Sequence, residues 1–283
     1  MKSSFECVIC YHRQALRTAR ITTKDEKLIT KVLKSTMEYF MNTPNWKRTP
    51  LDFGYDLYPL FYKVLGVDDP YKKLKEKSNE LALSIYPWTK ESIEQSSDPL
   101  LTAIRFSIAG NIADYGAMDE FDLEDQIKTS LNKDFAINNY SIFKREIKRA
   151  KTVLYFLDNA GEAVFDKVFI ETLFSLYPNL SKISVVAKRY PLINDMTFED
   201  AYALGFAEDE RVEVLTTWKD VNWKEKLKEY DVVISKGQGN YEGLSVYPNI
   251  FFLLVAKCEV VANDIGVNIG DFIFKLSDDK GAL

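Results

Sequence analysis

The strongest constraint on the fold is a change of pattern near residue 151, after which short apolar runs alternate with segments of helical periodicity. The first run, Thr152–Leu157, is rich in β-branched and aromatic residues. Similar runs cover residues 182–187, 211–215, 231–235 and 250–255, and helical patterns cover 162–176 and 219–230. Thr197-Phe198-Glu199-Asp200 resembles a capping box that opens another helix. Continuous apolar strands that alternate with helices predict a mostly parallel sheet covered on both faces.

The first half of the chain has the pattern of helices instead. Apolar residues recur with helical spacing in residues 25–39, and residues 52–66, 70–86 and 100–114 show similar patterns. We therefore predict an α/β fold in two parts: an all-helical domain at 1–150 and a Rossmann-like, mostly parallel sheet domain at 151–283. Ligands of such sheets bind outside the carboxyl ends of the strands, so the second domain is expected to carry the active site.

A single histidine, His12, limits the chemistry that the chain can support. A histidine-based catalytic triad, a multi-histidine zinc site and a two-histidine iron site cannot be assembled within this chain. The three cysteines, Cys7, Cys10 and Cys258, are too few and odd in number for a disulfide scaffold. A metal would therefore be bound mainly by Asp, Glu, Asn and backbone oxygens, which suit hard cations such as Mg²⁺ and Mn²⁺.

The charge balance bears on the partners of the chain. There are 37 Lys and Arg against 42 Asp and Glu, a formal net charge of −5. This balance argues against a nucleic-acid partner but allows a small anionic substrate in a local basic pocket. The sequence shows no apolar stretch near the roughly 20 residues that span a bilayer, and no pattern of a secretory signal. We expect a cytoplasmic protein that binds a small molecule and no membrane.

Polar residues follow four of the predicted strands, at the edge of the sheet where a ligand would bind. Asp158, Asn159 and Asp195 can supply oxygens to one divalent cation, which would polarise a phosphoryl oxygen. Lys236 can neutralise another oxygen, and Gly237 lets backbone N–H groups approach a phosphate. Each residue also has a plainer interpretation, because Asp-Asn and Lys-Gly pairs often only form turns or cap helices. The pattern alone indicates an enzyme for small molecules and leaves metal dependence open.

Several short motifs, in order along the whole chain, resemble those of the damage-control phosphatases. They are Cys7-x-x-Cys10, Gly110-Asn111-Ile112-x-Asp114, Asp158-Asn159-Ala160-Gly161-Glu162 followed by Asp166, Asn194-Asp195 with Asp200-Ala201, and Ser235-Lys236-Gly237-Gln238-Gly239-Asn240-Tyr241-Glu242. The cysteine pair matches the mainly prokaryotic branch of that family. The resemblance implies a helical bundle joined to a Rossmann-like domain. It also implies metal-dependent hydrolysis of phosphate monoesters on damaged or side-product metabolites, with nucleotides or sugar phosphates as candidate substrates.

The resemblance further implies roles for individual residues. The metal (Mg²⁺, Mn²⁺, Co²⁺ or Ni²⁺) would be bound by Asp158, Asn159 and Asp195. Catalysis is assigned to Asp158, Asp195 and Lys236, of which Lys236 would contact the phosphate. Substrate binding is assigned to a further set, the first two members of which would reach the site from the helical part: Asn111, Asp114, Glu162, Gly237, Gln238 and Asn240.

Two other functions stay open at this point. A nucleotide- or metabolite-binding protein without turnover would keep the glycine-containing loop after the fourth strand but would not need both Asp158 and Asp195. A methyltransferase would share the fold, although the chain lacks a glycine-rich loop after its first strand. The Cys7 and Cys10 pair, with His12, could bind zinc, form a redox pair or serve only the structure. We expect it to lie apart from the strand-end site.

Overall fold

The computed structural model describes residues 1–111 and 120–278 of the chain, and its centre is a seven-stranded sheet. The strands are β1 (Phe135–Asn138), β2 (Thr152–Phe156), β3 (Lys182–Lys188), β4 (Val212–Thr217), β5 (Val232–Lys236), β6 (Ile250–Val255) and β7 (Phe272–Leu276). Their order across the sheet is β1-β7-β6-β5-β2-β3-β4. The mixed α/β class and the mostly parallel sheet are confirmed, because only the pairing of β6 with β7 is antiparallel in the described sheet.

The order of the strands reverses between β2 and β5. From β2 the chain proceeds outward through β3 and β4 on one side, and from β5 through β6 on the other. Phe156 of β2 is level with Val186 of β3 and with Ser235 of β5, so these three strands end close together. A reversal of this kind leaves a crevice at the carboxyl ends of the two central strands. The sheet therefore places the loops after β2, β3 and β5 around one crevice.

All five predicted strands are present, and two further strands were not predicted. Strand β1 lies in the segment expected to be all-helical, and it pairs in parallel with β7. Its side chains alternate between half-buried and exposed positions, as at a sheet edge, so it lacks the continuous apolar pattern of the central strands. The predicted helix at 219–230 is also shorter, since it consists of α11 (Trp223–Lys226) and a 3₁₀ turn at Leu227–Glu229.

Helices cover both faces of the sheet, and each face has its own hydrophobic core. The helices on one face are α4 (Lys72–Ser84), α5 (Tyr86–Glu94), α6 (Pro99–Ala109), α7 (Glu120–Leu131), α8 (Tyr140–Ile147), α9 (Glu162–Leu176) and α10 (Phe198–Ala203), with a 3₁₀ turn at Phe206–Glu208. The other face is covered by α11, α12 (Gly237–Leu244) and α13 (Glu259–Ile265). The α4–α8 helices share a core with the sheet, while the predicted domain boundary near residue 150 stays a prediction.

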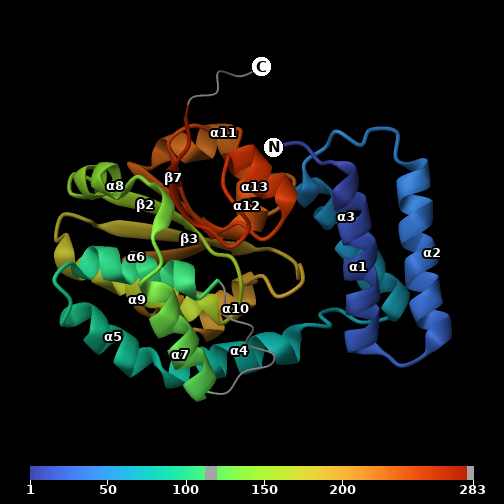
Figure 1. The fold of residues 1–283 in the computed structure, drawn as a ribbon, viewed down its shortest axis with the longest axis horizontal. Coiled ribbons are helices and arrows are strands. Elements are labelled where there is room, and N and C mark those ends of the chain that lie inside the picture. Colours follow the sequence, from blue (N-terminus) through green and yellow to red (C-terminus); the bar gives the residue numbers. More distant parts are fainter. Residues whose placement is uncertain (112–119, 279–283) are drawn as a thin grey trace.

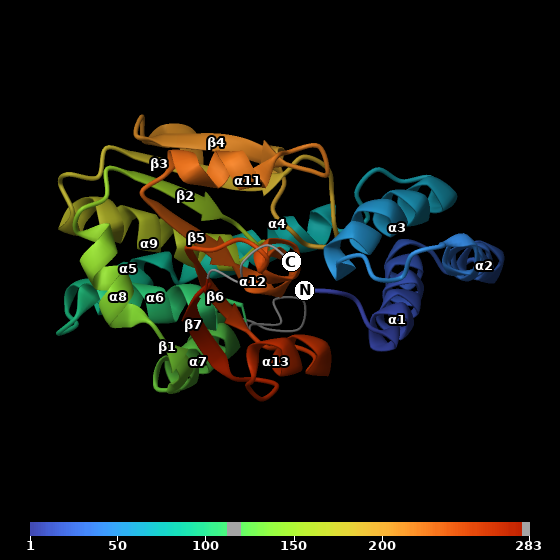
Figure 2. The same ribbon diagram turned by 90° about the horizontal axis from the view of Figure 1, so that it is seen from above.

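The first three helices form a separate arm with a third core. Helices α1 (Phe5–Thr22), α2 (Glu26–Asn42) and α3 (Pro50–Leu65) pack together through residues such as Ala15, Val32 and Phe53. Figure 1 shows this arm at one end of the molecule, with α2 outermost. Figure 2, turned by 90°, shows the N-terminus beside α12, where the Met1 amine donates to Ser245 Oγ at 2.8 Å. Within the described ranges, no helix is both long and apolar enough to cross a membrane.

Candidate active site at the strand ends

Backbone hydrogen bonds join the loops after β2 and β3. The N–H of Met196 donates to the Asp158 carbonyl at 2.8 Å, and the N–H of Ala160 donates to the Asn194 carbonyl at 2.9 Å. Between these bonds, Asn159 and Asp195 form an isolated antiparallel bridge. The three residues predicted to bind a metal, Asp158, Asn159 and Asp195, are therefore brought together by main-chain geometry. Asp158 and Asp195 are both buried.

The loop after β5 packs tightly against the same site. Gly237 has a positive φ of 75°, which side chains of L-residues rarely adopt. A Cβ added to Gly237 would lie 1.8 Å from Oδ2 of Asp158, which is less than any real contact. Because Gly237 has no side chain, the carboxylate of Asp158 can occupy its observed position.

Asn111 and Glu162 also lie close to the carboxylate of Asp158. The Asn111 amide nitrogen donates to Asp158 Oδ2 at 3.0 Å and to Glu162 Oε2 at 2.5 Å. The Asn159 amide nitrogen donates to the same Asp158 oxygen at 2.7 Å. Asn111 directly follows α6 and its cap, and Glu162 begins α9, so residues from two helices meet the loop after β2. The predicted contribution of Asp114 lies outside the described residues.

Lys236 is the last residue of β5, and its side chain is fully buried beside Glu162 and Asp166. Its ammonium donates to Glu162 Oε1 at 2.6 Å, to Asp166 Oδ1 at 2.7 Å and to the Ser107 carbonyl at 2.8 Å. An ammonium has three hydrogens, so these acceptors occupy all of them. The predicted direct contact of Lys236 with a phosphate would require one of these bonds to break.

A second buried lysine, Lys188, was not singled out from the sequence. It ends β3, is 2% exposed, and donates to Asn240 Oδ1 at 2.7 Å. Its ammonium is 3.7 Å from Asp195 Oδ2. Asn240 in turn donates to the carbonyls of Leu157 and Lys236, so it joins the ends of β2, β3 and β5. The signal that could have revealed Lys188 is a lysine that directly follows the apolar residues Val185, Val186 and Ala187 at the end of the strand.

Burial and mutual repulsion raise the pKa of the carboxyl groups at this site. Burial holds the pKa of Asp158 well above its ordinary value, and Glu162 and Asp195 raise it further. Burial raises the pKa of Asp195 to about 6, against the opposing effect of Lys188. Burial alone would lower the pKa of Lys188, but Tyr55, Asp195 and Asp158 raise it above its ordinary value. The site therefore concentrates negative charge that a bound cation would stabilise.

The residues present suit a hard divalent cation. Four buried carboxylates (Asp158, Glu162, Asp166, Asp195) and two buried lysines (Lys188, Lys236) leave a formal charge of −2. Oδ1 of Asn111 is buried and has no hydrogen-bond partner among the residues that the structure describes. In the part of the chain that the structure describes, no three His, Cys, Asp or Glu side chains converge as metal ligands do. The predicted set contains only two carboxylates, since its third member is the amide of Asn159.

Gln238, predicted to bind substrate, faces a different neighbourhood. Its amide nitrogen donates to Glu242 Oε1 at 3.1 Å and to Cys258 Sγ at 3.4 Å, and its oxygen accepts from the N–H of Lys257 at 2.9 Å. These bonds connect α12 to the start of α13. The described geometry thus gives Gln238 a role between helices, while its predicted contact with substrate stays a prediction.

The cysteine pair lies in the first turns of α1, and its expected separation from this site stays a prediction. Burial raises the pKa of the Cys7 thiol, and Glu242 of α12 and Cys258 raise it further. Glu242 also interacts with Asp195, and burial raises its pKa to about 7. Cys7, Cys10 and Cys258 are all free thiols. His12 lies within α1, where its Nδ1 contacts the Val8 carbonyl at 2.8 Å and its ring stacks on Phe40 at 5.6 Å between ring centroids.

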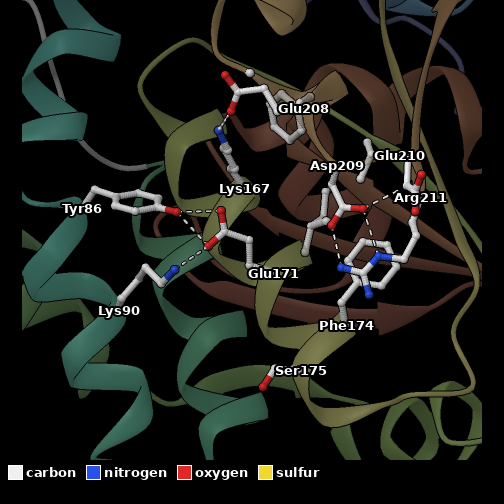
Figure 3. Close-up of a pocket in the computed structure, with 14 residues that line it drawn as sticks. Tyr86, Lys90, Lys167, Glu171, Phe174, Ser175, Glu208, Asp209, Glu210 and Arg211 are labelled. Atoms are coloured by element: carbon white, nitrogen blue, oxygen red, sulfur yellow. Dashed lines mark hydrogen bonds and ion pairs between the residues drawn. The ribbon is translucent and has the colours of Figure 1, made fainter.

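A surface pocket of about 900 Å³ lies elsewhere, among α5, α9 and the segment before β4. Figure 3 shows that its charged side chains pair with one another, with Lys90 and Tyr86 on Glu171 and Arg211 on Asp209. None of the strand-end residues described above lines it. Because its lining lacks these residues, this pocket is not the candidate active site, although it is large.

Comparison with known proteins identifies the family. Residues 3–273 match the Damage-control phosphatase ARMT1-like domain. A damage-control phosphatase of Archaeoglobus fulgidus is 34% identical, covering 98% of this chain and 99% of that protein. One from Pyrococcus horikoshii is 29% identical, covering 96% of this chain and 97% of that protein. The crystal structure of a DUF89 family protein from Pyrococcus horikoshii has a TM-score of 0.89 at 30% identity, covering 98% of this chain and 100% of that one.

A Rossmann-like sheet with a buried acidic site at its point of strand reversal, together with these similarities, defines a phosphatase of small metabolites. The chain belongs to the damage-control phosphatase family, whose members act on damaged or side-product metabolites. Membership decides between the functions left open by the sequence, in favour of the phosphatase over the methyltransferase and the binding protein without turnover. The assignment to the cysteine-bearing branch stays a prediction.

Proposed function

We propose that this phosphatase hydrolyses phosphate monoesters with the help of one divalent cation bound by Asp158, Asn159 and Asp195. The observation that carries the proposal is the joining of the β2 and β3 loops, which brings oxygen donors together in a buried site with a formal excess of negative charge. Oxygen-only donors favour Mg²⁺, Mn²⁺ or a similar cation, which would polarise the phosphoryl group. Small phosphorylated metabolites, among them nucleotides and sugar phosphates, are the proposed substrates, and a cytoplasmic location stays a prediction.

The residues around the proposed ligands prepare the site before substrate arrives. Asn111 holds Asp158 and Glu162 through one amide nitrogen, which leaves its buried oxygen available. The ammonium of Lys236 donates hydrogen bonds to Glu162 and Asp166 and so holds both side chains in place. Because these groups are already oriented and desolvated, little reorganisation is needed during the reaction. Glu162 is the proposed residue for orienting a water at the site.

Removal of metal tests the proposal directly. Exhaustive chelation should abolish hydrolysis of a generic phosphate monoester, and Mg²⁺, Mn²⁺, Co²⁺ or Ni²⁺ should restore it. Asp158→Ala should fold and lose at least about a hundredfold in turnover, comparable with several kcal/mol of transition-state stabilisation. Full activity after chelation, or near-normal turnover in folded Asp158→Ala, would return Asp158 to the turn-forming interpretation.

A further inference from the structure

The two buried lysines at the site differ in what they have left to offer a substrate. All three hydrogens of the Lys236 ammonium are directed at protein acceptors between 2.6 and 2.8 Å away. Two of these acceptors are fully buried carboxylates, Glu162 and Asp166. Turning Lys236 toward a phosphate would leave a buried carboxylate without its partner, which is strongly unfavourable. Lys236 is therefore poorly suited to contact a substrate.

Lys188 has the opposite arrangement. It makes one short hydrogen bond, to Asn240 at 2.7 Å, and its nearest carboxylate oxygen, Oδ2 of Asp195, is 3.7 Å away. At 3.7 Å the second contact is an electrostatic pair and not a normal hydrogen bond. Since an ammonium carries three hydrogens, at least one of them has no short acceptor in the described part of the chain. Lys188 thus keeps a donor for a further oxygen.

The surroundings of Lys188 suit a phosphate. Through Asn240 it is bonded to the first half of α12, whose N-cap residue, Lys236, makes no capping hydrogen bond from its side chain. Gly239, in the first turn of this helix, faces open space, since apart from its chain neighbours and the helix backbone no atom of the described residues lies within 4 Å of where its Cβ would be. The N–H groups at the start of a helix and a nearby ammonium together attract an anion.

We propose that Lys188 binds the phosphoryl group of the substrate directly, with one phosphate oxygen accepting a hydrogen bond from its ammonium, and that Lys236 only positions Glu162 and Asp166. The proposal deepens the proposed function and rests on it for the identity of the reaction. The binding of phosphate by Lys188 is independent of the proposed function. A divalent cation would offset the formal charge of −2, a sum that already includes Lys188, and Lys188 would then be the buried cation with a hydrogen still free to meet a phosphate oxygen.

Binding of inorganic phosphate to the Mn²⁺-loaded protein separates this role from a purely structural one. Lys188→Met should bind Mn²⁺ within about threefold of wild type but lose about tenfold or more in phosphate affinity, the loss expected for a charge-assisted hydrogen bond. Lys188→Arg should recover part of that affinity, because it keeps the charge with a different shape. Lys167→Met, a lysine of the remote pocket, is the matched control and should bind phosphate normally. Calorimetric titrations of Mn²⁺ and of phosphate give both affinities.

Steady-state kinetics on an accepted phosphate ester provides a second measurement. We expect Lys188→Met to raise KM and lower kcat, since a charge that meets both bound substrate and transition state affects both constants. Unchanged phosphate affinity in a folded Lys188→Met protein that binds Mn²⁺ would overturn the inference. Loss of Mn²⁺ binding in both Lys188 variants would also overturn it, by assigning Lys188 to the metal site. If wild type binds phosphate through Lys188 but hydrolyses no ester, the proposed function fails and the inference stands.

Discussion

At the scale of single residues, the site depends on Gly237 as much as on its charged groups. Gly237→Ala would place a methyl group 1.8 Å from Asp158 Oδ2 and strain a backbone with φ of 75°. Displacement of Asp158 by even 1 Å should lower kcat/KM by about a hundredfold. Gly266→Ala is the matched control, because Gly266 also has a positive φ, of 85°, but its Cβ would meet nothing within 4 Å. If both variants keep full activity, the contact with Asp158 is not critical.

Individual site residues differ in how far the sequence could predict them. Asp158, Asn159 and Asp195 could be placed together because each follows an apolar strand, and parallel strands end at one edge of the sheet. Lys188 comes directly after the predicted strand at 182–187, and only its contacts with Asn240 and Asp195 show that its charge faces the site. The three acceptors of Lys236 come from α6 and α9, and no local pattern links those positions to the end of β5.

At the scale of elements, Lys236 joins β5 to α6 and α9 in a fully buried cluster. Lys236→Met should lower the free energy of unfolding by about 3–5 kcal/mol, since it leaves two buried carboxylates without their cation. Adding Asp166→Asn should recover part of this loss by removing one of those charges. Urea unfolding of the single and double variants checks both expectations. Wild-type stability in Lys236→Met would show that the carboxylates are paired in some other way.

The elements themselves were predictable where burial is complete. Strands β2, β3, β5 and β6 are buried along nearly their whole length, and their continuous apolar runs distinguish them from the helices between them. Strand β1 has only four residues and two exposed positions, so its sequence carries little signal, and its place follows from pairing with β7. Helices α2 and α3 were recognisable from their periodicity, whereas α1 was covered only by the general prediction of a helical first half, and the contact of α3 with α12 arises only from tertiary packing.

At the scale of the whole molecule, the buried carboxyl groups link stability to pH and to metal. Burial raises the pKa of Asp166 and of Asp195 from 3.8 to about 6. A carboxyl group with a raised pKa holds its proton more tightly in the folded chain, so its contribution to stability is lost as pH rises through the folded value. The surface carboxylates with lowered pKa, such as Asp98 and Asp231, lose their contribution only below this range.

In chelator, the midpoint of thermal unfolding should therefore fall between pH 5 and 7. Saturating Mn²⁺ should reduce or reverse this fall, because the cation binds the deprotonated carboxylates. Asp195→Asn should flatten the profile in chelator and weaken the response to Mn²⁺. Calorimetric scans at each pH, with and without Mn²⁺, test the prediction, and a midpoint that rises from pH 5 to 7 in chelator would contradict it.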